Sequence, residues 1–81
     1  MERTMLIEII TPDQNLFEGE ATLASFPGSD GSFGVLDAHA PMVATLKEGK
    51  IKLVVDGKEH FFEVNGGVVE VKHNKVIVLA D

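Results

Sequence analysis

The sequence predicts an all-β domain, built as a sandwich or barrel of short strands. Apolar residues recur with a period of two, which places them on one face of a strand, and turn-forming residues interrupt them about every eight to ten positions. No segment shows the longer period of an amphipathic helix. We expect roughly nine strands. They form a single domain over residues 1–81, because a chain of this length has room for one core.

The expected strands begin close to the amino terminus. Residues 5–10 form the first strand, and a turn over residues 11–14 follows, in which Pro12 lacks the amide donor that a ladder needs. The second strand begins at Leu16. The others are expected at residues 21–26, 32–36, 42–46, 50–55, 58–64, 68–72 and 75–80.

Residues 47–49 predict a short hairpin between the strands at residues 42–46 and 50–55, because the segment that joins them is brief and contains a glycine. Alternation in the second of these strands places three apolar side chains on one face, and the lysines between them point outward. The three apolar residues are Ile51, Leu53 and Val55.

Asp56 and Gly57 give the strongest turn signal in the chain. A tight primed turn needs positive φ at both central residues, and this pair tolerates it, so it joins the strands on either side in a hairpin. His73 and Asn74 turn the chain into its last strand. The glycines within residues 65–67 allow a bulge or a close approach of two backbones.

Composition argues against several classes of function. The net charge is −6, from 13 acidic and 7 basic side chains, whereas nucleic acid and anionic lipid select basic proteins. Without cysteine, the chain has no disulfide, no thiolate nucleophile and no cysteine-based zinc site. No apolar run approaches the ~20 residues of a membrane span, and the amino terminus does not fit a signal peptide. We therefore expect a soluble intracellular protein that reaches a membrane only through another protein.

The segment over residues 26–42, FPGSDGSFGVLDAHAPM, is the most informative part of the chain. Its glycines do not match nucleotide-binding motifs, because no Lys-Ser/Thr pair and no helix follow them, so they predict tight turns. His39 precedes Ala40 and Pro41, and the proline favours extended backbone before it. Two interpretations of His39 stay open: a hydrogen bond to a nearby backbone carbonyl, or contact with a partner protein.

The remaining polar residues do not predict a catalytic or metal site. His39, His60 and His73 fall in different elements without the spacing of paired metal ligands. The serines lack the glycine-flanked turn of a hydrolase nucleophile, and Glu48 interrupts a small group of lysines. The acidic residues of the strands are expected on their solvent side, without a cleft to focus them: Glu18, Glu20, Glu59 and Glu63.

An ordered set of motifs covers the whole chain. It comprises LFEG at residues 16–19, PGSDGSFGVLDAHAPM at residues 27–42, LKEG at residues 46–49, NGGVVEV at residues 65–71 and the final strand at residues 76–81. In this order and spacing, the sequence resembles the amino-terminal β domain of the epsilon subunit of F-type ATP synthases. Each motif is weak alone, and the ordered set is specific.

The resemblance implies a flattened ten-stranded β-sandwich of two five-stranded sheets. It also implies a non-catalytic subunit of the central stalk, without a cofactor, that docks on the gamma subunit and on the ring of c subunits. There it would couple proton translocation to ATP synthesis, as a peripheral protein at the cytoplasmic face of the bacterial inner membrane.

The same resemblance assigns two sets of contact residues. The gamma contact would comprise His39, Ala40, Pro41 and Met42. The c-ring contact would comprise Ser29, Asp30, Gly31 and Ser32. Asp37 and Ala38 depart from the family, which often has proline and glycine there, so we expect a less rigid loop before His39. Ser32 also stands at a position that is frequently acidic.

Longer members of this family continue, after the position that resembles Asp81, into a helical hairpin that restrains ATP hydrolysis and in some cases binds ATP. The sequence stops at Asp81. We therefore expect no inhibitory arm and no nucleotide site in this chain.

Two other classes of protein stay open as alternatives. A carrier domain of the lipoyl or biotinyl kind is also a small acidic β-sandwich, and Lys58, just after the turn at Asp56 and Gly57, is the nearest candidate for modification. It lacks the residues that flank such a lysine. A small hydrolase or metal enzyme would need a pocket in which polar groups converge.

Overall fold

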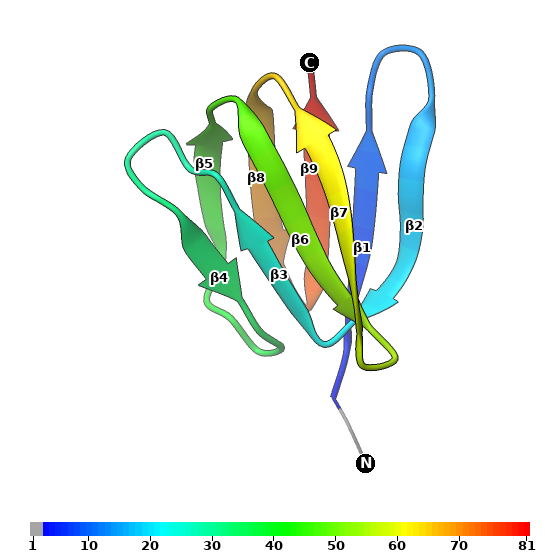
Figure 1. Ribbon diagram of the computed structural model, residues 1–81. Coiled ribbons are helices and arrows are strands. Elements are labelled where there is room, and N and C mark those ends of the chain that lie inside the picture. Colours follow the sequence, from blue (N-terminus) through cyan, green and yellow to red (C-terminus); the bar gives the residue numbers. More distant parts are fainter. Residues whose placement is uncertain (1–2) are drawn as a thin grey trace.

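The computed structural model describes residues 3–81 as two β-sheets that pack face to face (Figure 1). The strands are β1 (Met5–Ile10), β2 (Asn15–Ala21), β3 (Leu23–Phe26), β4 (Phe33–Val35), β5 (Met42–Leu46), β6 (Gly49–Val55), β7 (Lys58–Val64), β8 (Gly67–Lys72) and β9 (Lys75–Ala80). The larger sheet has the order β2-β1-β9-β8-β5, and the smaller sheet has the order β4-β3-β6-β7. β1 and β9 pair in parallel, and the other neighbouring strands are antiparallel.

The all-β prediction is confirmed, but the described residues form nine strands, five in one sheet and four in the other, rather than ten in two sheets of five. Residues 27–32 bend between β3 and β4. The Gly31 amide donates to the Gly28 carbonyl at 3.0 Å, and Gly28 makes an isolated bridge to Leu46. Because its backbone turns instead of extending, this segment adds no fifth strand to the smaller sheet.

The hydrophobic core fills the space between the sheets. Alternate residues of most strands point inward, as the period of two predicts, and no polar or charged side chain of residues 3–81 is buried. Burying one large aliphatic side chain contributes about 1.5–3 kcal/mol, so this layer holds the sheets together. The largest side chains in it are Met5, Ile7, Ile9, Phe26, Ile51 and Leu53.

The expected strand over residues 21–26 is divided between the two sheets. β2 ends at Ala21 in the larger sheet, and β3 begins at Leu23 in the smaller one. Thr22 lies at the crossing, where its amide donates to the Val54 carbonyl at 2.9 Å. The weak alternation in this stretch therefore reflects a change of sheet.

The hairpin predicted at residues 47–49 is wrong. β5 pairs with β8 in the larger sheet, whereas β6 pairs with β3 and β7 in the smaller sheet. The chain crosses between the sheets at Lys47, whose amide donates to the Pro27 carbonyl at 2.9 Å. A Cβ on Gly49 would lie 2.7 Å from the Pro27 Cβ, so this glycine permits a close crossing of two segments.

The two predicted tight turns are confirmed. Asp56 and Gly57 have φ values of 52° and 78°, and His73 and Asn74 have φ values of 51° and 60°. Positive φ at both central residues is the geometry of the primed turn that matches the twist of a hairpin. The close approach expected within residues 65–67 is also present, since a Cβ on Gly67 would lie 2.3 Å from the Leu79 carbonyl oxygen.

Candidate docking surface

The two predicted contact segments lie at opposite ends of the sandwich, joined by the edge strand β5 (Figure 1). The loop over residues 36–41 leads into β5, and the turn that contains Ser29 is bonded to its far end. The Ser29 amide donates to the Thr45 carbonyl at 2.9 Å, and the Thr45 hydroxyl donates to Ser29 Oγ at 3.0 Å. β5 thus connects the two segments and holds the turn that contains Ser29.

The glycine-rich turn presents a polar surface. Ser29, Asp30, Gly31 and Ser32 are all exposed. Gly31 has a φ of 129°, which side-chain-bearing residues rarely adopt. The chain then enters the extended strand β4, and a helix amino terminus, which phosphate cradles use, is not part of this arrangement. The predicted c-ring contact is therefore an exposed turn of fixed shape.

The loop before β5 exposes Ala40 and Pro41, while His39 and Met42 are half-buried. His39 Nδ1 lies 2.7 Å from the Ala40 carbonyl oxygen, so one of the two interpretations of His39, the local hydrogen bond, is confirmed. A carbonyl only accepts, so Nδ1 carries the hydrogen, and in the neutral ring Nε2 is then an acceptor. Contact with a partner stays a prediction, in which Nε2 would receive a donor.

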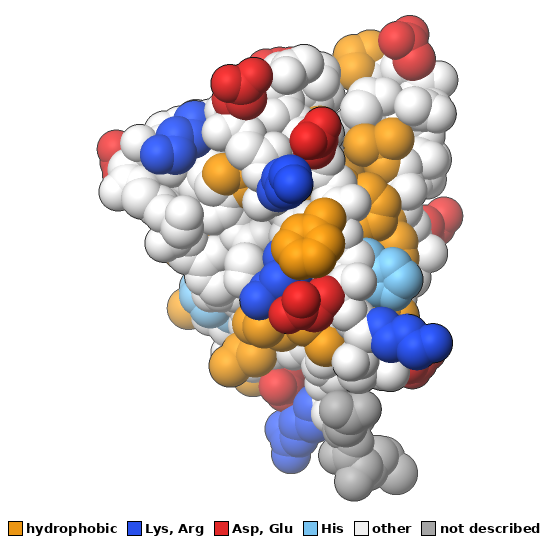
Figure 2. Space-filling model, viewed as in Figure 1, with side chains coloured by type: hydrophobic (Ala, Val, Ile, Leu, Met, Phe, Trp, Pro, Cys, Tyr) orange, Lys and Arg blue, Asp and Glu red, His pale blue; other side chains and the backbone are white. Residues whose placement is uncertain are grey.

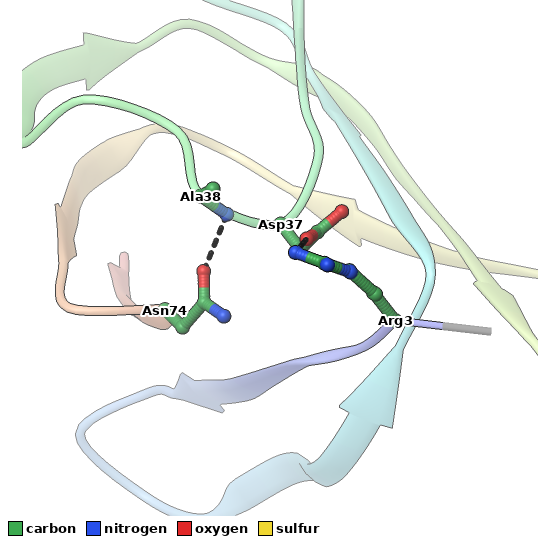
Figure 3. Close-up of polar contacts among 4 residues, drawn as sticks. All are labelled: Arg3, Asp37, Ala38 and Asn74. Atoms are coloured by element: carbon green, nitrogen blue, oxygen red, sulfur yellow. Dashed lines mark hydrogen bonds and ion pairs between the residues drawn. The ribbon is translucent and has the colours of Figure 1, made fainter. Parts of the chain in front are cut away.

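Two side chains from other parts of the chain hold this loop (Figure 3). The Ala38 amide donates to Asn74 Oδ1 at 2.5 Å, and Arg3 Nη1 lies 3.9 Å from Asp37 Oδ2. From the sequence, Asn74 was expected only to form the turn with His73. The sequence feature that hinted at a support for this loop was Ala38, which stands where the family often has glycine.

The outer face of the larger sheet carries exposed apolar side chains that sequence analysis missed. Val43 is 68% exposed on β5 and Leu79 is 56% exposed on β9, and Val68 of β8 lies directly opposite Leu79. Together with Ile77 and Glu70 they line a shallow groove across these three strands. The unbroken apolar run at residues 76–80 was the available signal, because such runs mark strands covered on both faces.

A second hollow connects this face with the glycine-rich turn. Ser29, Asp30 and Gly31 line one side of it, and Met42 and Val43 line the other. Residues from both predicted contact sets therefore border one depression beside β5. His39 lies outside it, so the structure brings together only part of the predicted site.

The outer face of the smaller sheet is different. Figure 2 shows Lys or Arg and Asp or Glu side chains scattered over this face, in front of β6 and β7. Lys52 and Glu59 form an ion pair across these strands at 3.5 Å, and Phe61 is an isolated exposed aromatic side chain. This mixture is typical of a solvated surface.

Within residues 3–81, no three His, Asp or Glu side chains are placed to hold a metal ion. In the same residues, no helix has the length and apolar character needed to cross a membrane. The described surface instead has a groove lined by exposed apolar side chains on the larger sheet.

Comparison with known proteins agrees with this picture. Residues 4–81 match the family model of the ATP synthase delta/epsilon chain β-sandwich domain. An ATP synthase epsilon chain of Desulforamulus reducens is 40% identical over 81 residues, covering 100% of this chain and 61% of the relative. One of Chlorobium limicola is also 40% identical, covering 99% of this chain and 92% of the relative.

The fold is also found in solved structures. A chain in the cryo-EM structure of the Euglena gracilis mitochondrial ATP synthase assembly of OSCP, F1 and c-ring aligns with a TM-score of 0.89 at 19% identity. The alignment covers 95% of the present chain and 50% of that one. With the match over residues 4–81, these findings show that the chain belongs to the family of ATP synthase delta/epsilon chain β-sandwich domains.

Proposed function

We propose that this chain is a rotor subunit of the central stalk of a proton-driven F-type ATP synthase. It docks on the gamma subunit and the c-ring, and it couples proton translocation to ATP synthesis by passing on rotation. The match to ATP synthase epsilon chains over the full length of this chain carries the proposal. The chain spans only 61% of the length of the Desulforamulus relative. The role of a whole epsilon subunit is therefore proposed for this chain.

Gamma docks at His39, Ala40, Pro41 and Met42 and continues onto the apolar face beside them. Val43 follows Met42 directly and, among residues 3–81, is the most exposed of the large apolar side chains. Contiguous apolar area on a soluble domain marks an interaction surface, because covering it removes unfavourable contact with water. His39 Nε2 adds a hydrogen-bond acceptor at the end of this area.

The c-ring docks at the opposite end, on Ser29, Asp30, Gly31 and Ser32. These residues are exposed and polar, and the bonds between Ser29 and Thr45 hold the turn in place. Polar loops of a membrane-embedded ring suit such a surface, since hydrogen bonds and charges set orientation at a rim. Separate ends for two partners allow one rigid domain to link them.

Residues 1–81 act in this proposal as one domain without catalytic chemistry, cofactor or metal of its own. It is a peripheral component on the cytoplasmic face of the bacterial inner membrane, held there through its partners. The carrier-domain alternative is not favoured, although Lys58 is exposed beside its turn, because the full-length relatives are ATP synthase epsilon chains.

The decisive experiment mixes the purified chain with gamma from the same source. We expect a one-to-one complex by gel filtration with light scattering, and attachment of that complex to purified c-ring. Separate elution of chain and gamma at micromolar concentration would contradict the proposal. Intact-mass measurement after coexpression with lipoyl and biotinyl ligases tests the alternative, for which a mass increase at Lys58 would be required.

A further inference from the structure

We propose that Asn74 is a positioning residue for docking: its side chain holds the loop over residues 36–41 in the conformation that a partner binds. This inference rests on the proposed docking of gamma at His39 to Met42. It adds to that proposal a residue from a different hairpin, which lies outside both predicted contact sets.

The loop needs an external support because of its backbone. It crosses from β4, at the edge of the smaller sheet, to β5, at the edge of the larger sheet. Ala38 has a φ of 60°, in the left-handed region that residues with a Cβ disfavour. Glycine would adopt this conformation freely, whereas alanine must be held there. His39 follows immediately, so the direction of its ring depends on Ala38.

Asn74 supplies that support from a rigid part of the molecule. Its Oδ1 accepts from the Ala38 amide at 2.5 Å, and its own carbonyl accepts from the Leu6 amide at 3.0 Å. It is the second central residue of the tight turn between β8 and β9, with a φ of 60°. Asparagine tolerates this conformation better than most residues do, so one residue serves both the turn and the loop.

The second contact on the loop is weaker. Arg3 Nη1 and Asp37 Oδ2 are 3.9 Å apart, and the Arg3 side chain is 82% exposed. An exposed pair at this distance contributes little, because water screens it and the arginine loses conformational freedom in forming it. Asn74 is therefore the main tether, and Arg3 offers a control at the other flank of the same loop (Figure 3).

The tether acts by preorganisation. Without it, the loop populates other conformations at Ala38, and the apparent affinity for a partner falls by the fraction of the docking conformation that is lost. Losing one hydrogen bond of ordinary net strength corresponds to about a 3- to 10-fold change in such a population. The folded sandwich itself keeps its core and its ladders.

Two substitutions at Asn74 separate the side-chain bond from the turn. Asn74→Gly keeps the positive φ that the turn needs and removes the acceptor, whereas Asn74→Asp retains both an oxygen acceptor and tolerance of this φ. In the isolated chain, we expect Asn74→Gly to accelerate hydrogen exchange of the Ala38 amide about 3- to 10-fold. Asn74→Asp and Arg3→Ala stay within about 2-fold of the unaltered chain.

Affinity for gamma, measured by calorimetry, should follow the same order. We expect Asn74→Gly to weaken binding about 3- to 10-fold, and Asn74→Asp to restore it. Adding Ala38→Gly to Asn74→Gly removes the cost of positive φ at residue 38 and should restore part of the affinity. The unfolding midpoint of each variant shows that the sandwich is intact.

Unchanged Ala38 exchange in Asn74→Gly would overturn the tether. Faster exchange with unchanged gamma affinity would overturn its role in docking, and so would weakened binding that Asn74→Asp fails to restore. If the unaltered chain binds no gamma, the proposed function fails, while the exchange measurement still decides whether Asn74 holds the loop.

Discussion

The outer faces of the two sheets differ, although both sheets contribute buried apolar side chains to the core between them. The larger sheet exposes Val43, Val68 and Leu79 in neighbouring strands, and the smaller sheet exposes charged side chains around a single aromatic residue, Phe61. Alternation explains the inner faces, because both sheets need an apolar layer there. An apolar outer layer is not needed to fold a two-sheet domain, and it points to a partner on one side only.

The largest expected effect tests whether both inner faces support the core. Ile7→Ala in the larger sheet and Leu53→Ala in the smaller sheet each remove a fully buried side chain. Each should lower the free energy of unfolding by about 2–5 kcal/mol, from lost burial and the cavity that remains. Urea unfolding followed by circular dichroism measures both. If only one of the two variants lost stability, the inner face of the other sheet would not support the core as expected.

The next prediction tests the difference between the outer faces. Val43→Asp should weaken gamma binding by about 2–4 kcal/mol, because a charge would be desolvated within an apolar contact. Phe61→Asp is the matched control on the smaller sheet, because the Phe61 side chain is also apolar and largely exposed, at 56% against 68% for Val43. It should leave binding unchanged in the same calorimetric titration. If both variants lost gamma affinity equally, the proposal that gamma docks on the larger sheet alone would be wrong.

A smaller effect is expected where the apolar face meets the loop. His39→Ala removes the ring that bonds the Ala40 carbonyl and that we place against gamma. Binding should weaken by about 1–3 kcal/mol if the ring is desolvated in the contact. Calorimetry of the purified chain with gamma checks this. An unchanged affinity would leave His39 with its local hydrogen bond alone.

The smallest effect concerns the charged face. Lys52→Ala removes the ion pair with Glu59, whose side chain is 57% exposed. Such surface pairs contribute about 0–1 kcal/mol, so the unfolding midpoint should hardly move and gamma binding should not change. A clear loss of gamma affinity in this variant would mean that the charged face also docks.

Local sequence was sufficient where one structural requirement selects the residue type. Asp56 and Gly57 predicted their hairpin because a primed turn restricts both φ angles. Alternation in β6 placed Ile51, Leu53 and Val55 on one face, and of these Ile51 and Leu53 are buried and Val55 is half-buried, since a strand next to a core has one inward face. The all-β class and most strand bounds follow from these two rules.

Sequence was insufficient where segments distant in the chain meet. Gly49 was interpreted as part of a hairpin turn, but its missing side chain leaves room for Pro27, which lies beside it only in the folded protein. The hydrogen bond between Asn74 and Ala38 likewise joins two loops that are distant in the sequence, and neither residue's local sequence predicts this contact. The predicted contact sets came from family resemblance, and their separation at the two ends of β5 required the structure.

The parallel pairing of β1 with β9 has a consequence for folding. These strands are the first and last in the chain order, and they are neighbours in the interior of the larger sheet, with Ile7 beside Val76. That sheet cannot be completed until β9 has left the ribosome, and its closure requires the most distant strands to find each other. Such long-range pairing slows folding, typically to milliseconds or seconds. We therefore expect the domain to fold as one late cooperative unit.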